Sequence, residues 1–413
     1  MARVLFLTQV LPYPLDSGAK IRQYHMLRHL AQQHDVTLVS FVRPDNRPEH
    51  VAHLRGYARA VHVVPIRRSL WRNGLALARS VLSGAPAVIA RDDDAEMRRL
   101  LADLAHASPF NVVHADQISM AQYGLAAAQA KPVPRTLIDM HNAMYLVLER
   151  LAAQERNPLR RAFVRREARA MARYEASVCH AYDAILTVTP EDRDYLLALY
   201  PQDQRDDIAR KMTPIPICVD PVETTPVTHL PGPPTILHLG TMFWPPNAQG
   251  VLWFARDVLP LVWEQVPEAR FVIVGKDPPP EVVALAADPR IQVTGYAPDP
   301  MPYLEAADAF IVPLHAAGGM RVKILDAWLW GLPIVATPIG AEGIACRDGE
   351  DILIAADAPR FAAAVVRLLL DAGLNERLRR QGRAWVESRY AWQVVYRQVS
   401  RVYADMLDDG ATL

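Results

Sequence analysis

The chain has 413 residues, of which 51% are hydrophobic and 22% charged, and its 45 lysines and arginines balance its 45 acidic residues. This composition is typical of a globular protein with room for two domains of about 200 residues each. The neutral balance argues against nucleic acid as the main partner, because phosphate binding requires a basic face. The three scattered cysteines offer no metal-ligand spacing, and no apolar run reaches the roughly 20 residues of a membrane span, so we expect a cytoplasmic protein.

The first half of the chain alternates β-rich runs with helical patterns, which predicts a doubly wound parallel sheet. Helical patterns cover residues 19–34 and 160–183. Buried strands are expected at 4–8, 36–41, 61–66, 112–116, 136–141 and 184–189. The acidic run Asp92–Asp94 has the DxD spacing of a metal site, but it does not follow a strand. Because it precedes an amphipathic helix, we interpret it as acidic charge at a helix N-terminus and predict no catalytic metal.

From about Thr213 the pattern breaks into a proline-rich segment, which predicts an interdomain linker over 213–233. A second series follows, with strands expected at 235–241, 270–275, 291–296, 309–314 and 333–337. We therefore predict two Rossmann-like α/β domains, over 1–212 and 234–388, and a helix within 389–413 that packs back on the first domain. Ligands of such sheets bind beyond the carboxyl ends of the strands, so the cleft between the domains is the expected site.

Lysine is rare in this sequence, where almost every basic residue is arginine. Three of the five lysines, Lys20, Lys276 and Lys323, follow predicted strands. A chain that uses arginine nearly everywhere keeps lysine where a compact, flexible ammonium is needed, although biased codon usage explains the same count. Their positions indicate an anionic ligand.

Residues 315–327, HAAGGMRVKILDA, join a predicted strand to a helix that we expect to begin near Met320 or Arg321. The free N–H groups and dipole at the start of such a helix favour an anion. Gly318 and Gly319 lack the Cβ atoms that would keep a phosphate away from the backbone. An ordinary glycine turn explains the same pattern equally well.

On that helix, Gly319, Lys323 and Asp326 would share one face, opposite a core-facing side that includes Trp328. An ammonium and a carboxylate on one face suit a nucleotide diphosphate, with the ammonium on phosphate and the carboxylate on ribose hydroxyls. Arg321 would lie roughly opposite Lys323 and could join only if the first turn is irregular. The alternative is an ion pair on a solvated face.

Both halves of the chain resemble retaining family-4 glycosyltransferases of the GT-B fold, in which two Rossmann-like domains face each other across a cleft. The resemblance is most specific over 291–344. The other matching stretches are 11–30, 110–116, 137–142, 182–192, 237–254, 267–279 and 382–392.

The resemblance implies roles for residues of the second domain. Asp326 stands where these enzymes usually have the glutamate that binds the ribose. Gly318 replaces a second glutamate that contacts the donor sugar, so backbone amides around Gly319 and Met320 would take over that contact. Lys323 and Arg321 would stabilise the leaving diphosphate.

Other implied positions lie at strand ends. His141 would contact the donor sugar, although a lone histidine is often structural, and Gly18 with Lys20 would form a loop near the phosphate and acceptor, unless this is only a helix-entry turn. Gly240 would begin the donor site. Tyr296 would lie beside the nucleobase, or be a packed edge residue. Asn247 is expected to cap the helix that follows it.

The resemblance thus implies a retaining, metal-independent transferase that moves a sugar from a nucleotide diphosphate to a glycan or lipid-linked acceptor in surface polysaccharide synthesis. No cofactor is expected besides this co-substrate. A nucleotide-sugar 2-epimerase and a degenerate binding protein remain alternatives. The amphipathic segment 66–82 predicts peripheral contact with a membrane, whereas the arginine-rich segment 156–173 is interpreted as a solvated face.

Overall fold

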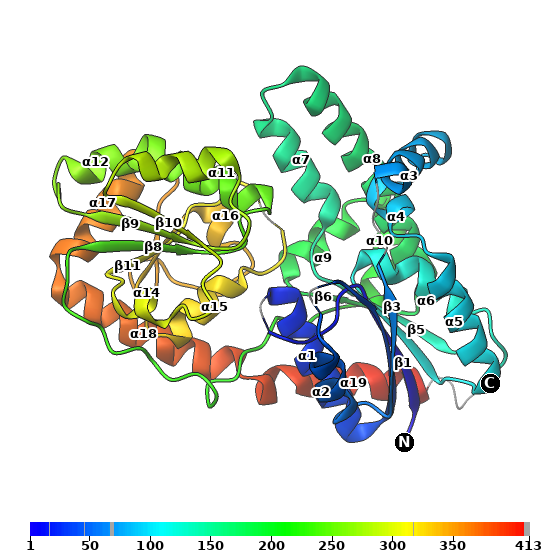
Figure 1. The fold of residues 1–413 in the computed structure, drawn as a ribbon. Helices are drawn as coiled ribbons and strands as arrows, with labels where there is room; N and C mark the ends of the chain where they lie inside the picture. The colour runs from blue at the N-terminus through cyan, green and yellow to red at the C-terminus, as the bar shows by residue number, and fades with distance from the viewer. Residues whose placement is uncertain (16, 45, 67–69, 317, 409–413) are drawn as a thin grey trace. The chain divides into compact units, whose positions relative to one another are not determined.

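The computed structural model describes residues 1–413 except 16, 45, 67–69, 317 and 409–413, and it contains two compact units (Figure 1). The N-terminal unit comprises Met1–Cys218, Gly318–Met320 and Trp392–Leu413. The C-terminal unit comprises Val219–Ala317 and Arg321–Ala391. Each unit is an α/β domain built on its own sheet, which confirms the predicted fold class at the level of the individual domains.

The N-terminal unit is built on a seven-stranded parallel sheet. Its strands are β1 (Arg3–Thr8), β2 (Asp35–Val42), β3 (Ala60–Pro65), β4 (Val112–Asp116), β5 (Arg135–Met140), β6 (Ala184–Thr187) and β7 (Met212–Pro214), in the order β3-β2-β1-β4-β5-β6-β7. The six strands predicted for this half are present, and β7 adds a short edge strand inside the segment interpreted as the start of the linker. The order reverses between β1 and β4, and this switch point is where doubly wound sheets bind ligands.

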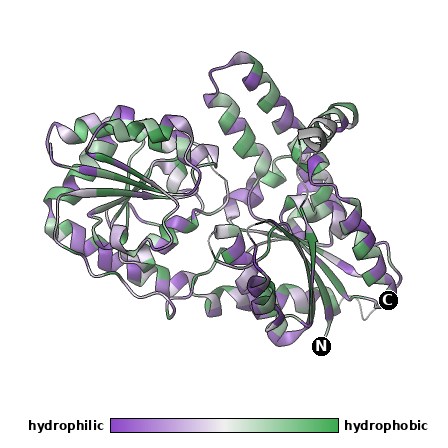
Figure 2. Ribbon diagram, viewed as in Figure 1, coloured by the Kyte–Doolittle hydropathy of each residue, from purple (hydrophilic) through white to green (hydrophobic). Residues whose placement is uncertain are grey.

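Helices cover both faces of the N-terminal sheet. They are α1 (Gly18–Gln33), α2 (Pro48–Arg55), α3 (Leu70–Ser83), α4 (Ala87–Arg91), α5 (Ala95–Ala107), the 3-10 turn η1 (Ile118–Met120), α6 (Ala121–Ala127), α7 (Met144–Gln154), α8 (Pro158–Ala181), α9 (Pro190–Leu197), α10 (Gln202–Lys211) and α19 (Trp392–Asp408). Because both faces are covered, the central strands are buried throughout and consist largely of Val, Leu, Ile and Phe. Figure 2 shows that these strands are hydrophobic and that the helices have both hydrophobic and hydrophilic residues.

The acidic run Asp92–Asp94 serves structure in the N-terminal unit. Asp94 is the N-cap of α5 and accepts hydrogen bonds from the backbone N–H groups of Glu96 and Met97. Asp92 accepts hydrogen bonds from Gln9 and Arg91, and Asp93 pairs with Arg98 at 2.7 Å. The three carboxylates therefore point to separate partners, and the interpretation as helix N-terminal charge is confirmed for Asp94.

The C-terminal unit repeats the same strand order in a six-stranded parallel sheet. The strands are β8 (Thr235–Leu239), β9 (Arg270–Val274), β10 (Ile291–Gly295), β11 (Ala309–Val312), β12 (Ile334–Ala336) and β13 (Leu353–Ile354), in the order β10-β9-β8-β11-β12-β13. The five predicted strands are present, and β13 is an additional two-residue strand. The switch point lies between β8 and β11.

The helices of this unit surround its sheet. They are α11 (Pro245–Trp253), the π-helical segment η2 (Phe254–Val258), α12 (Leu259–Trp263), α13 (Pro280–Val283), the 3-10 turn η3 (Ala284–Ala287), α14 (Met301–Glu305), α15 (Val322–Leu329), α16 (Pro338–Ala341), α17 (Ala358–Leu370) and α18 (Ala372–Tyr390). Helix α15 is fixed against α18 by Trp328, whose ring lies so close to Gly382 that an ideal Cβ there would be 2.2 Å from Trp328 Cδ1. Trp328 is fully buried, as its predicted core-facing position requires.

Helix α19 belongs to the N-terminal unit although it follows the C-terminal sheet in the chain. It buries Tyr396, Val399 and Tyr403, and the hydroxyl of Tyr403 bonds to His114 Nδ1 on β4 at 2.8 Å. Among the helices of the described ranges, none is both long and apolar enough to cross a bilayer.

Candidate active site

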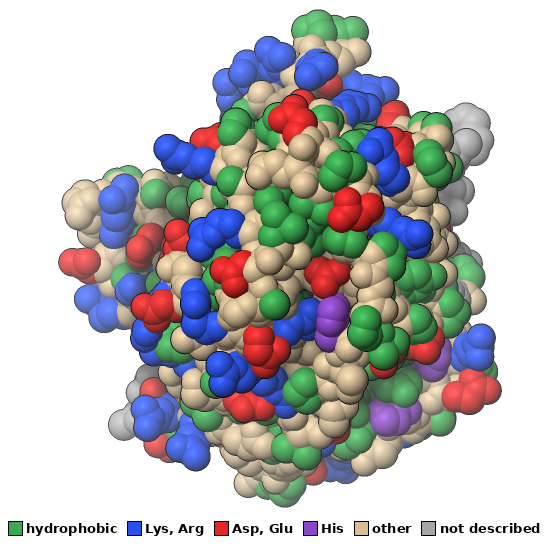
Figure 3. All heavy atoms as spheres, turned by 90° about the vertical axis from the view of Figure 1, so that its left-hand side faces the viewer, with side chains coloured by type: hydrophobic (Ala, Val, Ile, Leu, Met, Phe, Trp, Pro, Cys, Tyr) green, Lys and Arg blue, Asp and Glu red, His purple; other side chains and the backbone are tan. Residues whose placement is uncertain are grey.

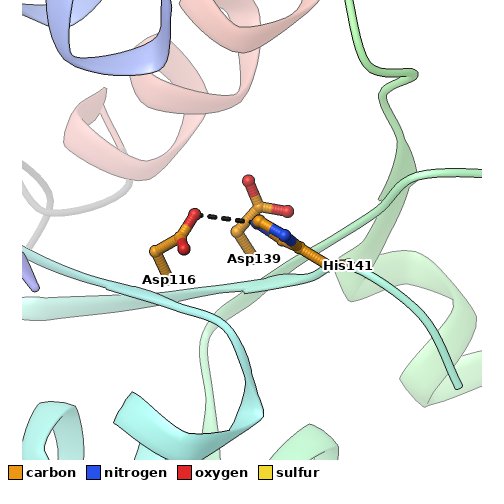
Figure 4. Close-up of side chains that lie close together, drawn as sticks. All are labelled: Asp116, Asp139 and His141. Atoms are coloured by element: carbon orange, nitrogen blue, oxygen red, sulfur yellow. Dashed lines mark hydrogen bonds and ion pairs between the residues drawn. The ribbon is translucent and has the colours of Figure 1, made fainter. Parts of the chain in front are cut away.

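The N-terminal switch point places His141 in a polar cluster. β4 ends at Asp116 and β5 ends at Met140, so His141 follows β5 at the carboxyl edge of the sheet. His141 Nε2 lies 2.9 Å from Asp116 Oδ1, and its Nδ1 lies 3.3 Å from Nε2 of the Gln117 side chain. The side chain keeps 11% of its surface exposed, whereas Asp116 is fully buried (Figure 4). The ring is therefore held on two sides and reaches solvent on the remainder.

Beneath this histidine lies a buried ion pair. Arg22 on α1 donates from Nε to Asp139 Oδ2 at 2.8 Å and from a terminal nitrogen to Oδ1 at 2.9 Å. Burial alone would raise the pKa of Asp139, but the adjacent Arg22 charge lowers it below the ordinary value. Arg22 also donates to the Ile215 carbonyl at 2.8 Å. The ion pair is thus bidentate, and the other terminal nitrogen of Arg22 also has a hydrogen-bond partner. Such an arrangement offsets the free-energy cost of burying two charges.

Asp116 differs from Asp139 because no arginine among the described residues forms an ion pair with it. Burial raises the pKa of Asp116, while the nearby His141 and a hydrogen bond from the Gln23 amide oppose that rise. Two donors, His141 Nε2–H and Gln23 Nε2–H, therefore stabilise the carboxylate form. The carboxylate in turn fixes the tautomer and direction of the imidazole.

Asp116, Asp139 and His141 offer three metal-ligating atoms within 4.8 Å of one another. These atoms do not fit a metal ion in this arrangement. Both oxygens of Asp139 are taken by the Arg22 guanidinium, whose charge would repel a cation, and His141 Nε2 is bonded to Asp116. The cluster is accounted for by ion pairing and hydrogen bonding among protein groups.

The C-terminal switch point places Lys323 beside the end of β8. Its Nζ donates to Asn247 Oδ1 at 2.9 Å and lies 3.4 Å from His238 Nε2. His238 Nδ1 donates to the Ile311 carbonyl at 3.0 Å, so Nε2 carries a lone pair toward the lysine. Burial and the Lys323 charge both lower the pKa of His238 well below its ordinary value. The ammonium is therefore oriented by neutral acceptors that leave its charge uncompensated.

Burial lowers the pKa of Lys323 to about 7, and it raises the pKa of Asp326, one turn along α15, to about 7. Both side chains are half-buried on one face of α15, as predicted, while Ile324, Leu325 and Trp328 are buried on the other. Among the described residues, neither Lys323 nor Asp326 has an opposite charge within ion-pair distance. The predicted alternative of a surface ion pair between them is therefore wrong.

Gly240 provides the room that Lys323 occupies. An ideal Cβ on Gly240 would lie 2.5 Å from Lys323 Nζ and 3.1 Å from Asn247 Nδ2. Asn247 was expected to cap the helix that follows it, but α11 begins at Pro245 with Trp244 as its N-cap. Asn247 lies within α11 and bridges the Thr241 carbonyl, at 2.8 Å, to Lys323. The capping prediction is wrong because two prolines start the helix before Asn247 is reached.

Two family models match the chain. The family model described as "Glycosyl transferase 4-like domain" matches residues 17–207, and the model "Glycosyl transferases group 1" matches residues 233–371. Residues 17–207 and 233–371 thus belong to glycosyl transferase domain families.

Individual curated relatives match less of the chain. A phosphatidyl-myo-inositol mannosyltransferase of Mycobacterium leprae is 30% identical over 43% of the chain and 48% of its own length. A lipopolysaccharide core biosynthesis glycosyltransferase, LpsE, of Rhizobium meliloti is 28% identical over 27% of the chain and 33% of its own length. The chain thus spans half or less of the curated relatives it matches. The solved structure of Anabaena Alr3699/HepE in complex with UDP-glucose covers 98% of the chain and 100% of its own, with a TM-score of 0.68 and 12% identity, which shows the GT-B fold.

The glycine loop before α15 differs from the prediction. Helix α15 begins at Val322, so Gly319 does not lie on its face, and Gly319 has φ 67°. The Gly319 N–H donates to Asp192 Oδ1 at 3.2 Å within the N-terminal unit. Because that donor is taken, the phosphate contact predicted for the Gly319 amide does not fit this structure. Gly318 lies in the same unit, with an ideal Cβ 2.7 Å from Val147 Cγ2, so a glutamate there would be displaced.

The remaining predicted residues lie as follows. Met320 is buried and its sulfur accepts a hydrogen bond from the Ile217 N–H at 3.3 Å. Arg321 is buried at the N-cap of α15. Gly18 and Lys20 lie in the first turn of α1. Tyr296 directly follows β10 and is 66% exposed, so its alternative interpretation as a packed edge residue is wrong.

Most partners of the candidate site residues were not predicted from the sequence. Asp116, Gln117 and Asp139 were not singled out, although Asp116 ends a predicted strand, Gln117 follows it directly, and Asp139 lies near the end of the next one. Arg22 and His238 were also missed, because a charged residue inside a helix or a histidine inside a strand gives no signal without a known partner. Acidic residues at the ends of two adjacent buried strands were the available clue.

Proposed function

We propose that this protein transfers a sugar from a nucleotide diphosphate to a glycan or lipid-linked acceptor of a surface polysaccharide, with retention of anomeric configuration and without a metal. The observation that carries the proposal is the position of Lys323. Its half-buried side chain places the ammonium at the β8/β11 switch point, where the neutral groups of Asn247 and His238 orient it. A diphosphate at this edge would supply the negative charge that the site itself does not provide.

The roles of the side chains follow from their chemistry. Lys323 stabilises the leaving diphosphate, and Asp326 accepts hydrogen bonds from the ribose hydroxyls. Gly240 leaves space for the phosphates beside Lys323, and Tyr296 offers an exposed ring to the nucleobase. His141 in the N-terminal unit orients the donor sugar, supported by Asp116.

In the transfer step, the bond between the anomeric carbon and the phosphate oxygen breaks, and a bond to the acceptor oxygen forms on the same face of the sugar. The acceptor proton passes to the departing phosphate. Because the ammonium and the helix dipole carry the charge compensation, this chemistry has no requirement for a metal ion.

Two tests decide the proposal. A donor with a site in the folded protein raises its melting temperature, so a panel of UDP, GDP and ADP sugars should reveal one that stabilises it, by about 2.7 kcal/mol at one hundred times Kd. Lys323→Ala should reduce transfer with that donor by about 10²-fold or more. The matched control is Lys211→Ala, which removes a lysine whose Nζ donates to the His180 and Tyr182 carbonyls.

The outcomes separate the alternatives. Full activity of Lys323→Ala would contradict the proposal that Lys323 stabilises the leaving diphosphate. A melting temperature unchanged by every sugar nucleotide would favour a degenerate protein that binds glycan only. A nucleotide-sugar 2-epimerase is not favoured, because the matching family models and the named relatives are glycosyl transferases.

We further propose that helices α3 and α8 of the N-terminal unit contact an anionic membrane, where a lipid-linked acceptor would be found. α3 exposes Val81 and Leu82, and α8 exposes Leu159 and Phe163 beside arginines. Residues 67–69 of the predicted amphipathic segment lie outside the described ranges. Figure 3 shows blue side chains gathered at the top of the view, where Figure 1 has the turn between α7 and α8.

The segment 156–173, interpreted from the sequence as a solvated face, combines arginines with exposed apolar side chains, a composition typical of interfacial helices. The protein should sediment with vesicles that contain phosphatidylglycerol and not with pure phosphatidylcholine. Leu159→Glu combined with Phe163→Glu should weaken that binding, while Val222→Glu, which changes an exposed valine of the C-terminal unit, should not. Absence of the unmodified protein from the anionic pellets would contradict the membrane proposal.

A further inference from the structure

Gln117 has a backbone conformation that is unusual for its residue type. β4 leaves the sheet at this residue, with φ 70° and ψ 152°. Residues with a Cβ rarely adopt this region, which belongs almost entirely to glycine. In the described part of the chain, Gln117 and Asp277 are the two non-glycine residues with positive φ. Such conformations persist where the surroundings impose them, and they cluster at functional sites.

The backbone contacts of Gln117 do not explain a glutamine. Its N–H donates to the Asp139 carbonyl at 2.9 Å, and its own carbonyl accepts from the Met120 N–H at 3.0 Å, which starts η1. A glycine would make both hydrogen bonds in the same conformation without strain. The reason for a glutamine therefore lies in its side chain.

The side chain of Gln117 reaches the imidazole of His141. Its amide nitrogen lies 3.3 Å from Nδ1, while Asp116 holds Nε2 at 2.9 Å from the opposite side. A carboxamide can offer its NH₂ to an unprotonated Nδ1 or, after rotation, its oxygen to a protonated one. Gln117 can therefore hold the ring in either charge state, which a carboxylate or an ammonium at this position could not do equally well.

We propose that Gln117 is a positioning residue whose strained backbone is retained because its side chain, together with Asp116, fixes the imidazole of His141 in one orientation. The consequence for transfer rests on the proposed function, in which His141 orients the donor sugar. An imidazole held at both nitrogens cannot swing away from the reacting carbon. Its alignment affects the transition state more than ground-state binding, so loss of Gln117 lowers kcat more than it raises the donor KM.

The test compares Gln117→Gly with Gln117→Ala. Both variants lose the side-chain contact, but only glycine relieves the backbone, so Gln117→Gly should melt roughly 2–4 °C or more above Gln117→Ala. Both should lose at least about tenfold in kcat, with donor KM changed by less than about threefold. If Gln117 served only to turn the chain, Gln117→Gly would be the more stable protein with kcat unchanged, and that result would overturn the proposal. Gln122→Ala, which loses a bond of 3.3 Å to the Ile89 carbonyl, is the control.

A second measurement does not depend on sugar transfer. The imidazole nitrogens of a ¹⁵N-histidine-labelled protein report tautomer and charge, and His141→Asn identifies the His141 signals among the 13 histidines. In the unmodified protein these signals should show one dominant ring state, and in Gln117→Gly they should broaden or average. If no donor is turned over, the proposed function fails, yet these signals still decide the role of Gln117. Identical His141 signals in both proteins would overturn it.

Discussion

The two switch points hold buried charge in different ways. In the N-terminal unit, Asp139 receives two hydrogen bonds from Arg22, and Asp116 receives bonds from His141 and Gln23. In the C-terminal unit, burial brings the pKa of Lys323 and of Asp326 to about 7, and no opposite charge among the described residues lies within ion-pair distance of either.

The difference indicates two ways in which one sheet topology prepares a site. A buried cluster with satisfied charges fixes the position of a side chain, here His141, before any ligand arrives. A half-buried lysine and carboxylate with shifted pKa values, in contrast, are left with charges that a ligand could compensate. Under the proposed function, the N-terminal cluster would position a side chain and Lys323 would bind the diphosphate.

The largest expected effect tests whether the N-terminal cluster is structural. Arg22→Met would leave Asp139 buried without its cation, and we expect the free energy of unfolding to fall by about 3–5 kcal/mol. Urea denaturation measures this change. The double variant Arg22→Met with Asp139→Leu should recover most of the loss, because no charge is then left unpaired. An Arg22→Met protein of unchanged stability would show that Asp139 is not held as the structure indicates.

The second prediction concerns the pH dependence of stability. The pKa of Asp326 is raised in the folded protein, so its contribution to stability is present below about pH 4 and is lost as the pH rises through 7. The pKa of Lys323 is lowered, so its contribution is present above about pH 10.5 and is lost as the pH falls through 7.

Asp326→Asn should therefore stabilise the protein at pH 8, and Lys323→Met should stabilise it at pH 6, each by about 1–3 kcal/mol after allowance for partial exposure. Both should weaken nucleotide binding. Melting curves at the two pH values measure the stability, with Lys211→Met as the control for removal of a positive charge. A loss of stability in both variants would mean that these charges are compensated.

The third prediction uses Gly240 to move Lys323 without removing it. The added Cβ of Gly240→Ala would lie 2.5 Å from the flexible end of Lys323, so the fold should persist while the ammonium is displaced. We expect nucleotide affinity to fall about tenfold, or about 1.4 kcal/mol. Calorimetric titration with UDP, GDP and ADP measures the change. Gly232→Ala, where no atom lies within 4 Å of the added Cβ, should bind as the unmodified protein does.

The smallest expected effect is a proton taken up on binding. With its pKa at about 7, Lys323 is largely neutral at pH 8, and a bound diphosphate favours the charged form. Nucleotide binding at pH 8 should therefore take up a fraction of a proton, approaching one. Titration calorimetry in buffers of different ionisation enthalpy measures the uptake. It should be greatly reduced in Lys323→Met, and equal uptake in the two proteins would assign the proton elsewhere.

Much of the fold follows from the sequence, because long buried strands and helices have strong periodicity. The strands missed, β7 and β13, have three and two residues and so carry almost no pattern. The start of α15 lies within one residue of the prediction, but the sequence did not show that Gly319 is outside the helix. The partner of its amide, Asp192, is 127 residues away in the chain.

Site residues could be predicted only where the type of residue and its position in the pattern of strands and helices both indicated a ligand. Lys323 and Asp326 stood out because they share a helix face after a buried strand. The cluster around His141 could not be predicted, since Arg22 and Asp139 are 117 residues apart and Gln117 matters through its backbone angle. Neither a contact between residues far apart in the chain nor an unusual backbone angle can be recognised from the residues next to it in the sequence.

The return of α19 to the N-terminal unit has a consequence for the order of synthesis. Tyr396 and Tyr403 fill the core beside β4 and α1, and each is 1% exposed. While a ribosome makes the protein, the first sheet emerges early but lacks these side chains until residues 392–408 have left the exit tunnel. The domain made second has all of its strands before then. We expect the C-terminal domain to complete its sheet first, while the nascent N-terminal domain stays partly open until α19 has been made.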